Sequence, residues 1–275
     1  MHSAKKIILC SDDFAQNSAI SRGILNLVER QRLSAVSCFT DSSLWQQYGA
    51  ELSGHHNEID LGLHFNLTHD FGYLNRPLGY WLARSVVAQL PLKEIRETLH
   101  RQCSEFMRVT GRLPDFIDGH QHVHILPGIR RVFLDYLAGQ NLIQALYVRS
   151  VVPMIPHGDD RLKSCVIRML ATGWRSAIRG YCPTNTTFAG VYSLKGEENY
   201  PALFQGWLAR SETGGLIMCH PGLESDDMID VIRGARVAEY QFFQSGRFPE
   251  MCKALDVTIA RFSKQTGPSK AAGCA

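Results

Sequence analysis

The stretch of the chain that decides the fold reads Ile117-Asp118-Gly119-His120-Gln121-His122-Val123-His124. Side chains of an extended strand alternate between its two faces, so the sequence predicts Asp118 and the three histidines on one face. A buried strand rarely carries this many polar groups without partners, and neutral imidazole is the commonest metal ligand in proteins. The stretch therefore indicates a metal site at the end of a strand. A polar strand end that is satisfied by hydrogen bonds is the alternative.

Outward from this stretch, further short segments read as strands because they are apolar or alternate in polarity. They cover residues 6–11, 35–40, 59–68, 144–149 and 215–219. Titratable groups lie at or near the ends of most of them, namely Asp12, Asp13, His64, Arg149 and His220. In a barrel of alternating strands and helices, the carboxyl ends of the strands carry the active site. We therefore expect an α/β fold, a (β/α) barrel of mostly parallel strands, with these groups in one cleft.

Between the predicted strands, apolar residues recur at helical spacing, which predicts connecting helices. It covers residues 20–30, 44–52, 92–108, 127–138, 161–179, 202–210 and 236–245. Residues 69–91 show no clear period, and we predict a loop beside the active site.

The predicted helix at residues 161–179 is basic as well as amphipathic. Leu162, Val166, Met169 and Trp174 can share one face, with lysine and arginine on the other. A surface helix packed on the barrel is the favoured interpretation. The alternative is an interfacial helix that touches anionic lipid, which would give peripheral membrane contact at the inner face of the membrane.

Composition excludes several classes of protein. The chain has 275 residues, 45% hydrophobic and 20% charged, with a formal net charge of +3. This charge is too small to indicate nucleic-acid binding, and no apolar run is long enough for a membrane span. The apolar run near the N-terminus is too short for a signal peptide, so we expect a cytoplasmic protein. The eight cysteines include no CxxC pair and therefore indicate neither a zinc knuckle nor a disulfide framework. One catalytic domain is expected over residues 1–262, with a flexible tail at 263–275.

One carboxylate with two imidazoles is typical of a catalytic metal site, because it leaves positions open for water and substrate. Such a metal polarises a carbonyl group and lowers the pKa of its bound water. A second carboxylate can act as a general base, and a histidine on the far side can protonate a leaving amine. Together these parts predict metal-assisted amide hydrolysis. Two nitrogen ligands favour Zn²⁺, whereas Mg²⁺ prefers oxygen ligands.

Four motifs, in chain order, resemble those of the YdjC/ChbG-like carbohydrate deacetylases, a family related to polysaccharide deacetylases. They are Ser11-Asp12-Asp13-Phe14, Gly62-Leu63-His64, Asp118-Gly119-His120-Gln121-His122-Val123-His124 and Cys219-His220-Pro221. The resemblance covers roughly residues 5 to 250. It implies a distorted (β/α) barrel and a divalent metal ion, which in this family is often described as Mg²⁺.

The resemblance also implies roles for individual residues. The metal ligands would be Asp13, His64 and His120. Asp12 would be the general base and His220 the general acid. Arg149 matches a family arginine near the site and would orient Asp12, with a plain ion pair as the alternative.

Four residues are candidates for contacts behind the metal ligands or along the substrate. They are Asp118, His122, His124 and Asn66. Two positions depart from the family pattern: Ala15 replaces a glycine, and Gly119 replaces the serine that usually follows the strand acid. Both are exchanges between small residues, which leave the metal assignment intact and bear on fine substrate contacts.

The main functional hypothesis is a metal-dependent N-deacetylase of an N-acetylated amino sugar. An alternative substrate is a polyprenyl-phosphate-linked N-acetylhexosamine of envelope synthesis or lipid A modification, which the segment 161–179 motivates. More distant alternatives are a metal-dependent phosphoesterase, which would need more bridging carboxylates, and a non-catalytic sugar-binding protein. The sequence leaves the sugar and the oligomeric state open, a homodimer included.

Overall fold

A computed structural model describes residues 4–140, 146–154, 160–178 and 181–263. Its strands are β1 (Lys5–Phe14), β2 (Ala35–Cys38), β3 (Asp60–Phe65), β4 (Phe116–Gly119), β5 (Tyr147–Val148), β6 (Phe188–Ala189), β7 (Gly215–Cys219) and β8 (Val257–Ile259). Its helices are α1 (Ser18–Glu29), α2 (Trp45–Ser53), α3 (Leu78–Val86), α4 (Leu92–Thr110), α5 (Ile129–Gly139), α6 (Arg161–Leu170), α7 (Trp174–Ile178), α8 (Tyr200–Arg210), α9 (Arg233–Gln244) and α10 (Arg247–Ala254).

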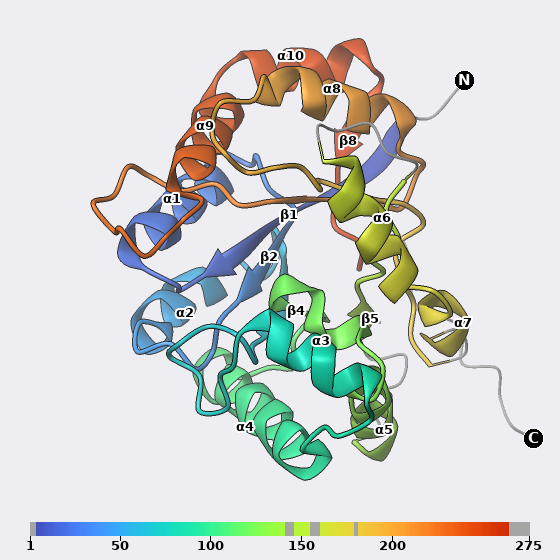
Figure 1. Cartoon of the computed structure of the whole chain (residues 1–275). Coiled ribbons are helices and arrows are strands. Elements are labelled where there is room, and N and C mark those ends of the chain that lie inside the picture. The colour runs from blue at the N-terminus through green and yellow to red at the C-terminus, as the bar shows by residue number, and fades with distance from the viewer. Residues whose placement is uncertain (1–3, 141–145, 155–159, 179–180, 264–275) are drawn as a thin grey trace, which may run out of the picture.

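The described strands form one curled parallel sheet in the order β5-β4-β3-β2-β1-β7-β6. β1 is an interior strand of the sheet, with β7 along one side and with β8 and β2 sharing the other. The outer strands β5 and β6 approach each other through a bridge between Pro153 and Phe188, just beyond β5. Helices surround this sheet on the outside (Figure 1). The predicted distorted (β/α) barrel of parallel strands is therefore confirmed.

The core forms where the sheet meets the apolar faces of the helices. Ile7, Ile8 and Leu9 of β1 are completely buried, as the central position of this strand requires. α4 buries the apolar stripe expected from its sequence, and it ends at Gly111, whose φ of 69° few other residues adopt without strain. Burying one large aliphatic side chain contributes about 1.5–3 kcal/mol, so this core holds the strand ends in fixed positions.

The prediction of an extended strand through the three histidines is wrong. β4 ends at Gly119, and a 3-10 helix, η1 (His120–Ile125), follows it. Gln121 and His122 adopt φ values of 49° and 60°, so the chain turns sharply where the polar alternation suggested a straight strand. As a consequence, the three histidine side chains do not share one face.

Other boundaries also differ from expectation. Residues 69–91 contain α3, and the predicted helix at 161–179 consists of α6 and α7, separated by a turn at Gly173, whose φ is 77°. The short strands β6 and β8 and the helix α10 were not predicted. Residues 141–145 and most of the expected tail lie outside the described residues. Among the helices that are described, none has the length and apolar character that crossing a membrane requires.

Candidate active site and metal centre

The adjacent carboxylates of Asp12 and Asp13 both face the cleft at the C-terminal end of β1. Consecutive residues of a regular strand point to opposite faces. Here the pairing of β1 with β2 is irregular between Ser11 and Phe14, and Asp13 adopts a φ of 65°. A left-handed backbone at a non-glycine residue costs free energy and is common at functional sites. This local turn brings both acids to one cavity.

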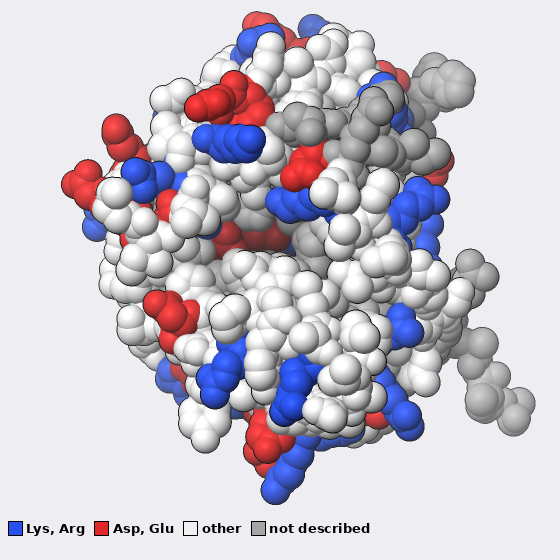
Figure 2. All heavy atoms as spheres, in the orientation of Figure 1, with Lys and Arg blue, Asp and Glu red and all other residues white. Residues whose placement is uncertain are grey.

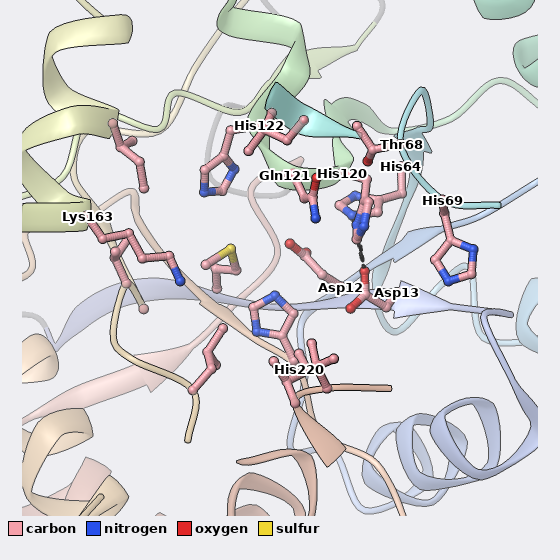
Figure 3. Close-up of a pocket in the computed structure, with 18 of the residues that line it drawn as sticks. Asp12, Asp13, His64, Thr68, His69, His120, Gln121, His122, Lys163 and His220 are labelled. Atoms are coloured by element: carbon pink, nitrogen blue, oxygen red, sulfur yellow. Dashed lines mark ion pairs between the residues drawn. The ribbon is translucent and has the colours of Figure 1, made fainter. Parts of the chain in front are cut away.

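Asp13, His64 and His120 converge at the ends of β1, β3 and β4. Asp13 Oδ1 lies 3.4 Å from His64 Nε2 and 3.2 Å from His120 Nδ1. One ligand atom from each residue lies within 4.8 Å of the other two, and Figure 3 shows the three side chains pointing toward one another. Asp13 Oδ1 is buried and has no hydrogen-bond partner. The donor set and the orphaned oxygen both fit a divalent cation.

Asp118 holds His64 from behind. Its Oδ1 lies 2.6 Å from His64 Nδ1 and accepts a 2.6 Å hydrogen bond from Ser37 Oγ. With the proton on Nδ1, the lone pair of His64 Nε2 faces Asp13 and the cleft, which is the usual arrangement behind a metal-binding histidine. Burial lowers the pKa of His64, but Asp118 and Asp12 outweigh it and raise the pKa to about 10. The surroundings of this ring therefore favour a positive charge.

Arg149 clamps two carboxylates just beyond the end of β5. Its guanidinium donates to both oxygens of Asp12 at 2.6 Å and lies 2.5 Å from Asp118 Oδ2, and the side chain is completely buried. Cys10, Asp12 and Asp118 form a second cluster with metal-ligand chemistry. The guanidinium also contacts Cys10 Sγ at 2.9 Å, so the side chain of Arg149 is already the counter-ion of this cluster.

His220 lies at the end of β7 and lines the same cleft as His64. Figure 3 shows it on the other side of Asp12 from His120. Burial lowers the pKa of His220 to about 4, although Asp13 and Asp12 oppose this shift. Glu239 of α9 accepts a hydrogen bond from the backbone N–H of His220 at 2.5 Å and another from Tyr192 Oη at 2.5 Å. These contacts fix the backbone that carries the histidine.

The four remaining candidates are placed differently from one another. Asp118 contacts His64, a member of the set Asp13, His64 and His120, which we call the metal group. His122 lines the cleft, whereas His124 is completely buried behind it, near Arg149 O and the Trp174 ring. Asn66 shapes the loop after β3, because its Oδ1 accepts from the backbone N–H groups of Thr68 and His69.

Sequence reasoning missed Arg236, which holds the other oxygen of Asp13. Arg236 Nη2 donates to Asp13 Oδ2 at 2.8 Å, and its Nε donates to Asp230 at 2.7 Å. The pKa of Asp13 is raised by burial, but Arg236 and the two histidines outweigh burial and hold it well below its ordinary value. A signal was present in the sequence: Arg236 and Glu239 occupy positions of the inward stripe of α9, which otherwise calls for apolar residues.

With the histidines in the neutral form that binds a metal, the buried charges of the site do not balance. Ion pairs and hydrogen bonds connect four carboxylates to two guanidinium groups, which leaves two negative charges when the histidines are neutral. The connected groups are Asp12, Asp13, Asp118, Asp230, Arg149 and Arg236. Unpaired buried charge is costly, and a divalent cation beside Asp13 would remove the imbalance.

The cleft above these groups has a volume of about 980 Å³. Figure 2 shows it as a hollow with acidic side chains at its floor and mostly uncharged atoms around its rim. Its size is that of a small-molecule site, and its polar groups converge on the floor.

A protein-family model described as YdjC-like protein matches residues 6–254. This chain belongs to the YdjC-like family. A chitooligosaccharide deacetylase of Serratia marcescens is 31% identical over 230 residues, which are 79% of this chain and 81% of that protein. A mouse carbohydrate deacetylase is 31% identical over 147 residues, or 48% of this chain and 47% of its own. The resemblance stated from the motifs is confirmed, and relatives of this chain are named as carbohydrate deacetylases.

Two solved structures share the fold of this YdjC-like chain. One, from Enterococcus faecalis V583, is described as a cellobiose-phosphate cleavage protein; it is 16% identical, with a TM-score of 0.66 over 96% of this chain and 99% of its own. The other is the Bc1960 peptidoglycan N-acetylglucosamine deacetylase, which is 11% identical, with a TM-score of 0.53 over 98% of this chain and 94% of its own. At these identities the likeness shows the fold alone.

The structure accounts for one departure from the family pattern. Ala15, where the family has glycine, adopts a φ of 71°, a conformation that glycine adopts without strain. The family glycine thus follows from the turn that carries Asp13, and this chain accepts the strain of a methyl group there.

Proposed function

We propose that this chain is a metal-dependent hydrolase that removes the acetyl group from an N-acetylated amino sugar. The observation that carries the proposal is the convergence of Asp13, His64 and His120 beside Asp12 and His220 in one cleft. The names of the relatives support it, since they describe deacetylases of chitooligosaccharides and carbohydrates.

Each site residue then has a role in amide hydrolysis. A metal ion held by Asp13, His64 and His120 would polarise the acetamide carbonyl and lower the pKa of bound water. Asp12 takes a proton from the attacking water as the new carbon–oxygen bond forms. Arg149 fixes the orientation of Asp12 through the two hydrogen bonds to its carboxylate oxygens. Asp118, which also contacts Arg149, fixes the ring of His64.

The leaving amine needs a proton when the carbon–nitrogen bond breaks. His220 lies across the cleft from the metal group and is our candidate for this donor. Because burial keeps its ring neutral at pH 7, His220 must first receive the proton that Asp12 has taken from the attacking water, and it then donates this proton to the leaving nitrogen. Acetate and the protonated amine are then the only products, and the protein returns to its starting protonation state.

The identity of the metal is also a proposal, which we base on the ligand atoms of the site. Two imidazole nitrogens favour Zn²⁺ over Mg²⁺, which prefers oxygen ligands and retains several waters. The described site offers one carboxylate oxygen and two imidazole nitrogens as ligand atoms. We therefore expect Zn²⁺ to bind more tightly than Mg²⁺, whichever ion gives the faster turnover.

Acetate release tests the proposal. Purified protein is incubated with N-acetylglucosamine, chitobiose and longer chitooligosaccharides, before and after chelation and re-addition of Zn²⁺ or Mg²⁺. We expect acetate and a free amine in equal amounts, loss of release after chelation, and recovery with metal. An aryl phosphate serves as the control substrate. Phosphate release without any acetate release would favour a phosphoesterase, and sugar binding without turnover would favour a binding protein.

A second candidate substrate is a polyprenyl-phosphate-linked N-acetylhexosamine, reached at a membrane surface through residues 161–179. The observation that favours it is the outward placement of Leu162 and Met169 on α6, which are 78% and 67% exposed. The continuous stripe expected from the sequence is not present, because Trp174 is completely buried. Arg175 also bonds backbone oxygens at residues 185–186, and Arg179 lies outside the described residues. The cytoplasmic location and the homodimer stay predictions.

Vesicle flotation measures the membrane contact. If α6 touches lipid, the wild-type protein floats with vesicles that contain anionic lipid, and a Leu162→Ser/Met169→Ser variant stays at the bottom of the gradient. Arg168→Gln should weaken flotation further, by roughly 1 kcal/mol for one cation near an anionic surface. Absence of flotation for every variant, at low salt and high lipid, would remove this candidate.

A further inference from the structure

The cleft has a wall of aliphatic side chains above its polar floor. Three separate elements contribute to it: α3, α6 and the segment that precedes α9. The residues are Leu78, Leu82, Leu162, Val166, Ile229 and Val231. On α3 and on α6 the two residues are four positions apart, so each helix presents an adjacent pair to the cleft.

Several of these side chains are strongly exposed. Leu162 is 78% exposed, Ile229 78% and Val231 88%, whereas most large aliphatic residues of this chain are buried. Isolated exposed apolar residues need no explanation, but a group that shares one cavity marks a binding groove. Figure 2 shows uncharged atoms along the lower rim of the hollow.

The lining of the cleft is aliphatic rather than aromatic. Among the described residues that line it there is no Phe, Tyr or Trp. A pyranose ring presents a flat face, which a flat aromatic ring matches, whereas branched aliphatic side chains match the curved surface of an alkyl or isoprenoid chain. Close contact between such surfaces gains dispersion energy and removes apolar area from water.

We propose that this wall is a subsite for an apolar aglycone, so that the substrate is an N-acetylated amino sugar joined to an alkyl or isoprenoid group. The inference rests on the deacetylase function proposed above and names its substrate class. The acetamide would lie at the metal group, and the aglycone would leave the floor between α6 and the segment Ile229–Val231.

The wall is tied directly to the catalytic floor. Asp230, between the two exposed residues Ile229 and Val231, accepts a hydrogen bond from Arg236 Nε at 2.7 Å. The same guanidinium bonds Asp13 Oδ2 at 2.8 Å. A chain of buried ion pairs therefore fixes the apolar segment relative to the metal group. On the opposite side, Lys163 of α6 lines the cleft, and its Nζ donates to Tyr192 O at 3.1 Å (Figure 3).

The chain offers matched controls for this subsite. Met169 lies on α6 and is 67% exposed, and Met228 precedes Ile229 and is 74% exposed. Neither of them lines the cleft. If the wall is an aglycone subsite, binding of the apolar group depends on Leu162 and Ile229 and does not depend on the two methionines. A general contact of this surface with lipid would depend on all four residues.

The experiment compares methyl and hexyl glycosides of N-acetylglucosamine, each below any aggregation concentration, by kcat/KM for amine release. Each buried methylene contributes about fourfold, so two or more buried methylenes should give the hexyl glycoside at least about a tenfold advantage. The Leu162→Ser/Ile229→Ser variant should lose most of this preference, so that its ratio of kcat/KM for the hexyl over the methyl glycoside falls toward one. The Met169→Ser/Met228→Ser variant should keep the preference.

Equal kcat/KM for the two glycosides with wild-type protein would overturn the subsite, as would equal loss of preference in both double variants. If neither glycoside is deacetylated, the failure belongs to the proposed function. Calorimetric binding of the two glycosides to the same proteins then decides the subsite: tighter binding of the hexyl glycoside, lost only with Leu162 and Ile229, supports it, and equal binding overturns it.

Discussion

Asp12→Asn is expected to reduce deacetylation by about 10²–10⁴-fold, the usual effect of losing a general base. The amide keeps the shape of the side chain and can still accept a hydrogen bond from Arg149. It cannot take a proton from water. The metal group is formed by other residues, so the affinity for Zn²⁺ should stay close to that of the wild type. Steady-state kinetics and calorimetric metal titration on the same preparation measure the two quantities.

The matched control is Asp13→Asn, one residue further along the same turn. Asp13 supplies the orphaned oxygen between His64 and His120, so this variant should lose metal affinity together with activity. If Asp12→Asn abolished metal binding instead, while Asp13→Asn kept it, the roles of the two aspartates would have to be exchanged.

Much of this site could be predicted because parallel strands bring their carboxyl ends together. Each motif closes an apolar segment short enough to be a strand, so the sequence alone predicts Asp12, His64 and His220 at one edge of a sheet, where the structure has them. The same reasoning places Arg149 correctly, just beyond β5. Only the period of the apolar residues and the direction of the chain are needed for this prediction.

The prediction of a strand through the three histidines was wrong for a local reason. Its alternation of polar and apolar residues is that of a strand. However, Gln121 and His122 adopt left-handed backbone conformations, which their residue types do not predict. His120 and His122 therefore reach the cleft from a turn, and His124 is packed behind it. Strands of two or three residues, such as β6 and β8, are too short to carry a period and were missed.

Arg236 shows another limit of prediction from sequence. Titratable groups at strand ends are visible in the pattern of the chain, but this residue comes from a helix and reaches Asp13 across the cleft. Its position among the buried residues Ala235, Glu239 and Phe243 of α9 is the one indication that the sequence holds. A charged residue in an inward helical position needs a buried partner, and here that partner is Asp13 of the candidate active site.

Arg149→Met is expected to destabilise the fold by about 3–5 kcal/mol at pH 7, because it leaves two buried carboxylates without their counter-ion. Asp12 and Asp118 are both within 2.6 Å of this guanidinium. For domains of 150–250 residues, each kcal/mol lowers the melting temperature by roughly 2–4 °C, so a loss of about 10 °C is expected. Calorimetry or urea unfolding measures it. Arg168→Met, an exposed change on α6, is the control and should leave stability nearly unchanged.

The dependence of this loss on pH gives a second measurement. Burial raises the pKa of Asp118, but Arg149 and His64 outweigh burial and hold it well below its ordinary value. A carboxylate whose pKa is lowered in the folded state stabilises the protein above the pKa of the unfolded chain, and this contribution fades as the pH falls through the folded-state pKa. Without Arg149 the carboxyl groups can take up protons instead, so the difference between wild type and variant should be largest near neutral pH and shrink in acid. A difference that stayed constant from pH 7 to pH 4 would mean that lost packing, rather than unpaired charge, destabilises the variant.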